Sequence, residues 1–368
     1  NDRESLEEIQ AETTVSKNQT EQKQHKRRVR YKGTHPRSYQ EKYKELQPEK
    51  YPETIEKVIQ KGGTPVGMHI SICVKEILDF LQIQPGQKGL DATLGYGGHT
   101  KEMLKCLQGQ GHLYALDVDP IESVKTKERL EKAGYGEEIL TIRQMNFADI
   151  DQIAKEAGPF DFVLADLGVS SMQIDNPERG FTYKKEGPLD LRLNPQKGVS
   201  AAERLKEVTE EELAGMLWEN SDEPYAEEIA ATVMEKLRKG EPVETTIQLQ
   251  KAIEEALSFL PEREQKEAVK KSCQRTFQAL RIDVNSEFEV LYAFMEKLPA
   301  ALAPGGRVAI LTFHSGEDRI VKKAFKELKR AGIYSEIAQD VIRPSAEECT
   351  RNSRARSTKM RWAVRAKE

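Results

Sequence analysis

Apolar and polar positions follow two different periods between residues 67 and 175. Short apolar runs that end in an acid or a glycine alternate with longer segments in which apolar residues recur at helical spacing. Such alternation predicts βαβ units, and therefore a parallel sheet that helices cover on both faces. The expected strands are residues 90–94, 112–116, 139–143 and 160–165, and the expected helices are residues 69–83, 99–107, 120–133 and 150–157.

The alternation stops near residue 176 and resumes at Ser286. In between, the strand signal is almost absent, apolar residues keep helical spacing, and Glu203–Glu228 contains ten acids against two basic residues. Beyond Ser286 we expect a helix to about residue 302, a turn at residues 304–306, a strand at 307–313, a helix to residue 330 and a last strand at 359–364. The expected domains are a sheet core of residues 63–175 and 284–368, an inserted helical domain of residues 176–283, and an N-terminal extension of residues 1–62.

Composition narrows the classes of protein that fit. The chain has 368 residues, a length that suggests about two domains. Its 57 Lys and Arg and 61 Asp and Glu give a net charge of −4, which excludes a surface that is basic throughout. No run of 18 apolar residues occurs, so no membrane-spanning helix is expected, and the acidic start shows no secretory signal. The four cysteines form no CxxC pair, which favours reduced thiols in a cytoplasmic protein.

Basic residues nevertheless concentrate in particular segments. Residues 23–44 contain nine Lys or Arg against one acid, with three tyrosines interleaved. This composition suits a flexible arm that binds nucleic acid, and it suits a solvated tail equally well. Residues 351–367 contain seven Lys or Arg and no acid, which predicts a surface facing nucleic acid, with a charged last strand as the alternative. The block Arg179–Arg192, with Lys184 and Lys185, is a further candidate.

A glycine-rich segment follows the first expected strand and opens the next helix. Its sequence, Asp91-Ala-Thr-Leu-Gly95-Tyr-Gly97-Gly98-His99, lets the backbone approach a ligand closely and offers the free N–H groups of a helix N-terminus. The spacing GxGG lacks the third glycine of the GxGxxG found in dinucleotide folds. The loop therefore favours S-adenosylmethionine, which has no pyrophosphate to cradle, over NAD.

Three acids, Asp91, Asp117 and Asp166, stand where strands are expected to end. The carboxyl ends of parallel strands meet at one edge of a sheet, and open α/β sheets bind ligands there. Asp117 follows Gly95 by 22 residues, and a carboxylate at that place can accept two hydrogen bonds from a ribose diol. A plain tight turn is the alternative interpretation of the loop, and the three acids together disfavour it.

From His69 to the C-terminus, the chain resembles the small-subunit ribosomal RNA cytosine-N4 methyltransferases of the MraW type. The matching motifs are DATLGYGGHT, ALDVDP, ADLGVSSMQIDNPERGFTYKKEGPLDLRLNP, RTFQALRIDVNSE, LAPGGRVAILTFHSGEDRIVK and NSRARSTKMR. One departure is Gly316 in FHSGEDR, where the family has an apolar residue. The resemblance implies an α/β fold of the class I S-adenosylmethionine-dependent methyltransferases, with a Rossmann-like, doubly wound, mostly parallel sheet, an inserted helical domain and an N-terminal extension.

The resemblance also implies the cofactor, the acceptor and the residues that hold them. The methyl donor is S-adenosylmethionine, and the acceptor is a cytidine near the decoding region of the small ribosomal subunit. The residues expected to bind the donor are Gly95, Gly97, Gly98 and His99 in the loop, Asp117 at the ribose, Phe147 beside the adenine, and Asp166 and Gln173.

Methyl transfer to cytosine N4 assigns Asp166 a catalytic role as well. The N4 lone pair is delocalised into the ring, and an acceptor of its N–H hydrogen bond favours a more pyramidal, more nucleophilic nitrogen. We therefore expect Asp166 between the donor and the amine, with a turn-capping carboxylate as the alternative. Asn285 and His314 should approach the same edge and are candidates to line the base pocket, although a strand-end histidine is equally often structural. No cysteine stands at a strand end for C5 chemistry, and no metal cluster is expected.

Other functions stay open on this evidence. A methyltransferase of this fold could act on DNA or on a small molecule, although a small-molecule enzyme would not need two basic segments. A catalytically silent ribosome-assembly factor would retain the fold, and the three strand-end acids argue against it. An NAD oxidoreductase is disfavoured by the loop spacing. The expected partner is small-subunit ribosomal RNA or the small subunit itself, with no membrane and no metal, and a homodimer is left open.

Overall fold

The computed structural model describes residues 70–368. Within them the chain forms two compact units. The helical unit comprises residues 177–192 and 197–285, and the sheet unit comprises residues 70–176, 193–196 and 286–368. The N-terminal extension of residues 1–62, with its basic cluster Lys23–Lys44, lies outside the described residues.

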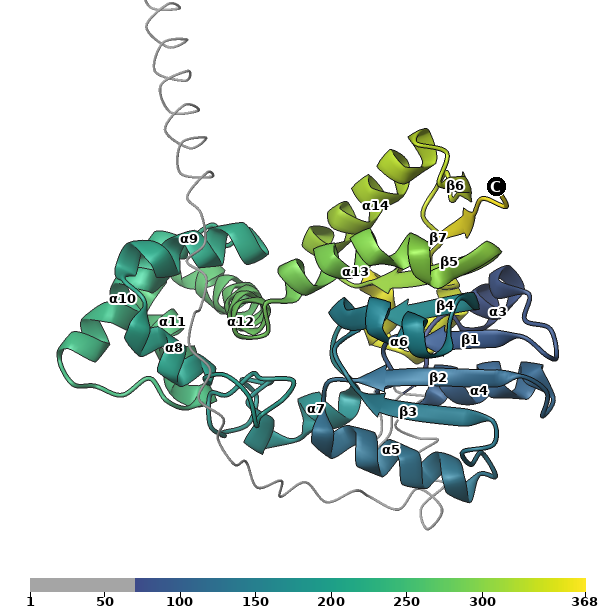
Figure 1. The fold of residues 1–368 in the computed structure, drawn as a ribbon. Coiled ribbons are helices and arrows are strands. Elements are labelled where there is room, and N and C mark those ends of the chain that lie inside the picture. Colours follow the sequence, from purple (N-terminus) through teal and green to yellow (C-terminus); the bar gives the residue numbers. More distant parts are fainter. Residues whose placement is uncertain (1–69) are drawn as a thin grey trace, which may run out of the picture. The chain divides into compact units, whose positions relative to one another are not determined.

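The sheet unit is built on a seven-stranded, mostly parallel sheet in the order β3-β2-β1-β4-β5-β7-β6 (Figure 1). Strands β1 to β5 run parallel to one another, while β7 is antiparallel to both β5 and β6. The order reverses direction at β1, so the sheet is doubly wound as predicted. The strands are β1 Lys88–Asp91, β2 His112–Asp117, β3 Leu140–Gln144, β4 Phe160–Asp166, β5 Leu302–Thr312, β6 Tyr334–Ile337 and β7 Lys359–Arg365.

Helices cover both faces of this sheet (Figure 1). Alternate residues of β4 point to opposite faces: Val163 and Ala165 pack with α6, α13 and α14, whereas Phe162 and Leu164 pack with α3, α4 and α5. Burial of both faces explains why the central strands are continuously apolar. The helices are α3 Val74–Leu81, α4 Gly98–Leu107, α5 Pro120–Lys132, α6 Ile150–Ala157, α7 Ser171–Asp175, α13 Glu287–Ala301, α14 Ser315–Arg330 and α15 Ala346–Arg351, with the 3-10 turns η2 Phe147–Asp149 and η4 Ser353–Ser357.

Four elements differ from the sequence prediction. The first strand, expected at residues 90–94, is β1 Lys88–Asp91, so residues 92–94 belong to the glycine loop. The helix expected at 69–83 is shorter, because Cys73 and Gln82 take left-handed backbone angles at its two ends. The turn expected at residues 304–306 is part of β5, whose pairing with β4 shifts register between Phe160 and Phe162. The short edge strand β6 has only four residues and gives too brief a pattern to recognise.

The helical unit contains α8 Ala201–Glu207, α9 Glu210–Ser221, α10 Ala226–Arg238, α11 Thr246–Ala256 and α12 Glu262–Val284, preceded by η3 Pro177–Arg179. Its own apolar core includes Leu213, Met216 and Leu217, three residues that set the helical spacing in the sequence. A buried ion pair between Arg204 and Asp283 ties α8 to α12 at 2.8 Å. The core explains why these residues form a unit rather than a loop.

None of the described helices is long and apolar enough to cross a membrane. All four cysteines lie in the described part of the chain and are free.

Candidate active site

Asp91, the last residue of β1, holds the glycine loop in place. One carboxylate oxygen of Asp91 accepts the Thr93 N–H at 3.0 Å, and the other accepts the Thr100 hydroxyl of α4 at 2.6 Å. The side chain is buried, and burial raises its pKa, which the bond from Thr100 opposes. Asp91 therefore joins the strand to the helix that follows and shapes the loop between them.

Each glycine of the loop has its own structural reason. Gly97, the N-cap of α4, has φ +87°, and an added Cβ would lie 2.8 Å from Thr126 of α5. A Cβ on Gly98 would lie 1.9 Å from the Ser71 hydroxyl oxygen. Gly95 has φ +54°, and a Cβ there would meet only the Thr93 carbonyl oxygen, at 3.9 Å. The loop thus lines open space at Gly95, and the first turn of α4 offers backbone N–H groups beside it.

The end of β2 connects to α7 through two caps. Asp117 accepts the Asp119 N–H at 2.9 Å, and Asp119 caps α5 by accepting the N–H groups of the next turn. The other carboxylate oxygen of Asp119 accepts the Gln173 amide at 2.8 Å, while the Gln173 oxygen accepts the Ser170 N–H. Gln173 is buried and holds α7 against the Asp117 turn. Its predicted contact with the donor, like that of Asp117, stays a prediction.

Asp166 ends β4 on the same edge of the sheet. Its N–H donates to the Thr93 hydroxyl at 2.6 Å, so the glycine loop and the β4 end are joined directly. Its carboxylate lies 3.4 Å from Nδ1 of His99, and its side chain is 17% exposed. The carboxylate is therefore held in place and still reaches solvent, as a group that receives a substrate must.

His99 has acceptors at both ring nitrogens. Nδ1 faces the Asp166 carboxylate, and Nε2 lies 2.7 Å from the Ile72 carbonyl. Burial disfavours the charged ring, but the hydrogen bond and charge of Asp166, the Ile72 carbonyl and the charge of Asp91 together raise the pKa of His99 to about 9. Two acceptors require two N–H donors, so His99 is an imidazolium at neutral pH and Asp166 is its counter-ion.

Phe147 follows β3 in η2 and packs edge-on against Phe294 of α13, with ring centroids 5.0 Å apart. It is half-buried, so one part of the ring belongs to the core and the rest faces outward. That position is compatible with the predicted contact with an adenine, which stays a prediction.

His314 is tied to its own helix. It is the N-cap of α14: Nδ1 accepts the Glu317 N–H, and Nε2 lies 3.1 Å from the Glu317 carboxylate. These contacts give the histidine a structural role, and its predicted part in the base pocket stays untested. Next to it, a Cβ on Gly316 would lie 2.8 Å from the ring tip of Phe288. Phe288 thus fills the space that an apolar side chain at position 316 would need.

Asn285 belongs to the helical unit rather than to the sheet unit in which the sequence pattern placed it. It caps the C-terminus of α12, and its side-chain amide donates to the carbonyls of Leu191 and Arg281, each at 2.8 Å. These bonds join α12 to the segment before α8. The expectation that Asn285 lines a base pocket stays a prediction.

The cations of the basic C-terminal segment are less available to nucleic acid than its composition suggests. Arg361 makes two hydrogen bonds to Asp318, at 2.7 and 2.9 Å, and Arg365 donates to the carbonyls of Pro299 and Ile333. Arg354 donates to the Ser171 hydroxyl and lies 3.6 Å from Asp175. For these three cations the contacts support the alternative of a charged last strand, and the expectation that the segment faces nucleic acid stays a prediction. Arg351, Arg356 and Lys367 are exposed.

Three residues that could ligate a metal do lie close together, and the expectation that the chain holds no metal stays a prediction. Ligand atoms of Cys73, Glu76 and Glu348 lie within 4.8 Å of one another. Burial and then the charge of Glu348 raise the pKa of the Cys73 thiol, and a protonated thiol is a poor metal ligand. Glu348 instead accepts the Cys73 N–H at 3.0 Å, which fixes the residue before α3. The sequence gives no sign of the grouping because 275 residues separate the two partners.

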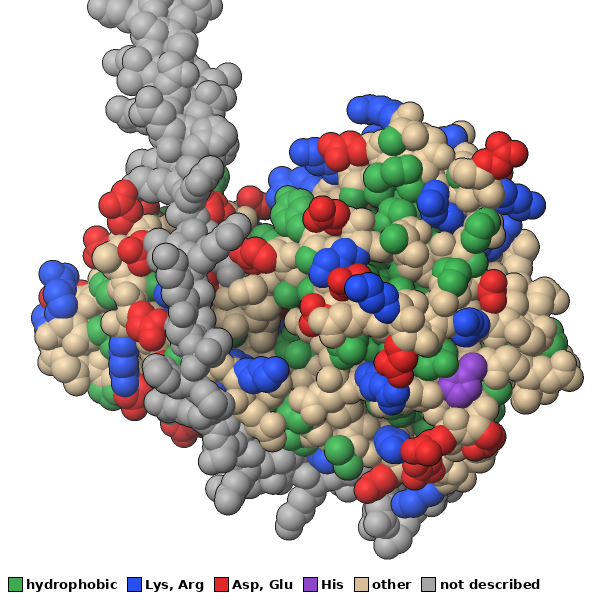
Figure 2. Space-filling view, viewed as in Figure 1, with side chains coloured by type: hydrophobic (Ala, Val, Ile, Leu, Met, Phe, Trp, Pro, Cys, Tyr) green, Lys and Arg blue, Asp and Glu red, His purple; other side chains and the backbone are tan. Residues whose placement is uncertain are grey.

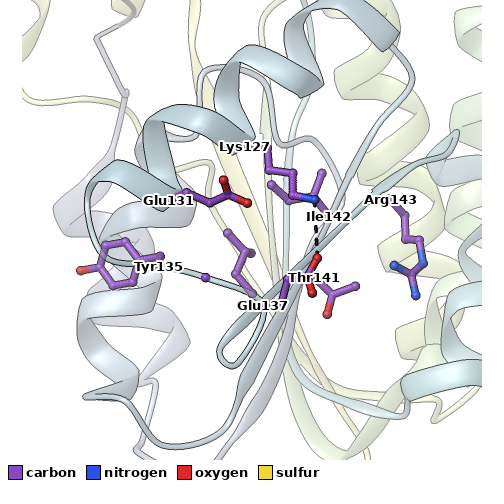
Figure 3. Close-up of a pocket in the computed structure, with 9 residues that line it drawn as sticks. Lys127, Glu131, Tyr135, Glu137, Thr141, Ile142 and Arg143 are labelled. Atoms are coloured by element: carbon purple, nitrogen blue, oxygen red, sulfur yellow. Dashed lines mark ion pairs between the residues drawn. The ribbon is translucent and has the colours of Figure 1, made fainter.

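A hollow of about 310 Å³ lies elsewhere, between α5 and the edge strand β3 (Figure 3). Charged side chains line it, and Lys127 pairs with Glu137 across it at 3.6 Å. It shares no residue with the strand-end acids or the glycine loop. The hollow is therefore separate from the candidate active site.

Sequence reasoning missed Thr93, Thr126 and Asp119. Thr93 joins the loop to Asp166, the Thr126 hydroxyl donates to the Gly95 carbonyl, and Asp119 connects Gln173 to α5. Only Asp119 left a signal, since an acid directly before Pro120 is typical of an N-cap.

A doubly wound sheet with a glycine loop after β1, an acid at the end of β2 and a second acid at the end of β4 defines a class I methyltransferase. The comparisons identify the family: residues 67–366 match the model of the MraW methylase family, and the chain belongs to it. The expected donor, S-adenosylmethionine, is confirmed at the level of this family. The open space at Gly95 and the N–H groups of α4 fit its bound form.

Similar proteins cover nearly the whole chain. "Ribosomal RNA small subunit methyltransferase H 1" of Lachnoclostridium phytofermentans is 70% identical over 93% of this chain and 93% of its own length. The protein of the same name from Agathobacter rectalis is 69% identical over 94% of this chain and 99% of its own. A solved structure, a SAM-dependent O-methyltransferase from Thermotoga maritima, aligns with a TM-score of 0.39 and 11% identity over 81% of this chain and 67% of that one.

Proposed function

We propose that the chain transfers a methyl group from S-adenosylmethionine to the exocyclic N4 of a cytidine in small-subunit ribosomal RNA, near the decoding region. The names of its relatives support the RNA. The choice of N4 rests on the motif resemblance and on the absence of a cysteine among the strand-end groups of the sheet unit. The observation that supports it best is Asp166 at the end of β4: its backbone N–H donates to the Thr93 hydroxyl, and its partly exposed carboxylate faces His99.

The bound donor supplies an electrophilic methyl group on a sulfonium. The chain's own residues position the two reactants. Asp117, at the end of β2, is the group that would accept hydrogen bonds from the ribose hydroxyls. The N–H groups of Gly98 and His99, in the first turn of α4, would hold the donor's carboxylate.

Asp166 would accept a hydrogen bond from the target amine and orient its lone pair. Nδ1 of His99 lies 3.4 Å from this carboxylate and fixes its orientation. The carboxylate can then accept the N–H while the nitrogen attacks. The proton released after transfer leaves through the exposed side of the carboxylate or directly to water.

The test uses small ribosomal subunits from cells that lack the activity, incubated with tritiated donor and then digested to nucleosides for mass spectrometry. Label on N4-methylcytidine is the expected result. Asp166→Ala should lower the single-turnover rate on the order of 10²-fold or more, with little change in RNA affinity, because the contact strengthens in the transition state. Asp166→Asn, which retains one acceptor oxygen, should keep part of the activity.

Asp340→Asn is the matched control, since Asp340 is exposed and outside the site. It should behave as wild type. Label on cytosine C5, on another base, or on DNA but not RNA would refute the proposed acceptor. An alanine variant at position 166 with the wild-type rate would refute the role of Asp166.

A further inference from the structure

Helix α14 has one apolar and one basic face. Ile320, Val321 and Phe325 are buried against the sheet. The exposed charges of the helix are six cations and one acid, in a chain whose net charge is −4. They are Arg319, Lys322, Lys323, Lys326, Lys329 and Arg330, with Glu327 as the acid. In Figure 2, the part of the surface that α14 occupies in Figure 1 carries several blue side chains, with red and green ones among them.

Four of these cations make a continuous track, here called the α14 track: Lys322, Lys323, Lys326 and Arg330. Lys322, Lys326 and Arg330 follow one another at four-residue steps, about 6 Å each along the helix axis. Such a step is on the scale of one nucleotide of a ribose-phosphate backbone. Among the described residues, the only ion pair recorded for the track joins Lys323 to Glu327, at the limiting distance of 4.0 Å. By contrast, the Lys329 side chain donates to the Ser335 carbonyl and so joins α14 to β6.

The α14 track also begins near the candidate active site of the sheet unit. Helix α14 follows β5 directly, and Leu311 of β5 is the pairing partner of Asp166 in β4. The N-terminus of α14 therefore lies one strand away from the carboxylate that would receive the target amine. A strand of RNA whose backbone follows the track toward the N-terminus of α14 would approach Asp166.

We propose that the α14 track binds the phosphate backbone of the substrate RNA next to the modified nucleotide. This inference rests on the proposed function for the identity of the RNA. The partner is a polyanion because the exposed charges of α14 are six cations and one acid, and phosphates are the groups that such cations bind. Base-specific contacts are not expected from the track, since lysines at this spacing read charge rather than sequence.

The experiment removes charge while keeping the helix. The track variant is Lys322→Gln, Lys326→Gln and Arg330→Gln together, since Gln forms helices about as well as Lys and Arg. The control variant is Lys101→Gln, Lys132→Gln and Lys155→Gln, three exposed lysines of α4, α5 and α6 with the same total change of charge. Binding to purified small subunits and to RNA extracted from them is measured between 0.05 and 0.5 M salt, a range chosen so that counterion release dominates.

The track variant should show a log–log salt slope shallower by about 2, because each lost single-strand phosphate contact contributes about 0.7. If wild type and the track variant bind equally at 1 M salt, that difference in slope makes the track variant bind up to about 100-fold more weakly than wild type at 0.1 M salt. The control variant should stay near wild type, and donor affinity should be unchanged in both. Glu327→Gln should have the opposite effect and tighten RNA binding.

Equal losses in the track and control variants would mean that only total charge matters, and would overturn the proposal. So would a track variant that binds as wild type. The readout is RNA binding, so a failure of the proposed N4 chemistry would appear in the nucleoside assay without changing this result. Circular dichroism and urea unfolding confirm that both triple variants are folded.

Discussion

His99→Gln should change how the stability of the sheet unit depends on pH. In the folded chain both ring nitrogens of His99 face acceptors, the Asp166 carboxylate and the Ile72 carbonyl. Asp91 and Glu348 add negative charge nearby. An imidazolium satisfies all of these groups, whereas a glutamine supplies hydrogen bonds without charge.

The sign and size of the change in stability follow from the linkage between protonation of His99 and folding. The pKa of His99 is raised from an ordinary value of 6.5 to about 9. The stability it contributes is complete below pH 6.5 and disappears as pH rises through 9. One pKa unit corresponds to about 1.4 kcal/mol, so the whole contribution is about 3 kcal/mol. His99 is buried, and solvent screening reduces this value little.

The assay is urea unfolding of wild type and His99→Gln at intervals from pH 6 to 9.5. The stability advantage of wild type over the variant should shrink by about 3 kcal/mol across this window. His112→Gln is the matched control, because burial lowers the pKa of that half-buried histidine. His112 should therefore contribute less stability as pH falls, the opposite sign. Curves for wild type and His99→Gln that run parallel would show that His99 is neutral, and the ion pair with Asp166 would be wrong.

Two further predictions concern packing and the basic tail. Gly98→Ala should destabilise the chain by about 1–3 kcal/mol in urea unfolding, because its Cβ would lie 1.9 Å from the Ser71 hydroxyl oxygen. Adding Ser71→Gly should recover most of this loss, and additive effects of the two substitutions on stability would contradict the close contact. Arg361→Ala should destabilise by about 1–3 kcal/mol, because buried Asp318 loses the two hydrogen bonds from Arg361 and keeps that from Thr312. Arg356→Ala, at an exposed position, should not destabilise, and equal unfolding midpoints for both variants would refute the structural role of Arg361.

The strand ends could be predicted from the sequence because their signal is local. An apolar run that stops at an acid marks the carboxyl end of a buried strand, and Asp117 and Asp166 are the last residues of β2 and β4. The helical insertion was recognisable for the same reason, since Leu213, Met216 and Leu217 show helical spacing without help from distant residues.

The contacts between these ends could not be predicted because they join residues far apart in the chain. Thr93 and Asp166 are 73 residues apart, and Gln173 and Asp119 are 54 apart. No spacing rule connects such pairs, because their distance depends on the order of the strands. Gly316 shows the same limit: the departure from the family motif is explained by Phe288, which a comparison of the motif alone does not reach.

The distribution of positive charge is the clearest case in which counting residues misleads. The tail has seven cations and no acid, but Asp318 of α14 faces inward and pairs with Arg361 and Lys359 of β7. Burial opposes the charge on Asp318, yet the hydrogen bonds from Arg361 and Thr312 lower its pKa, so it stays ionised and requires a cation. Asp318 at the start of α14 therefore neutralises cations of the tail, while the later cations of α14 are exposed. The C-terminal segment, with seven cations and no acid, partly serves the fold, whereas α14, with six cations and three acids, exposes all six of its cations.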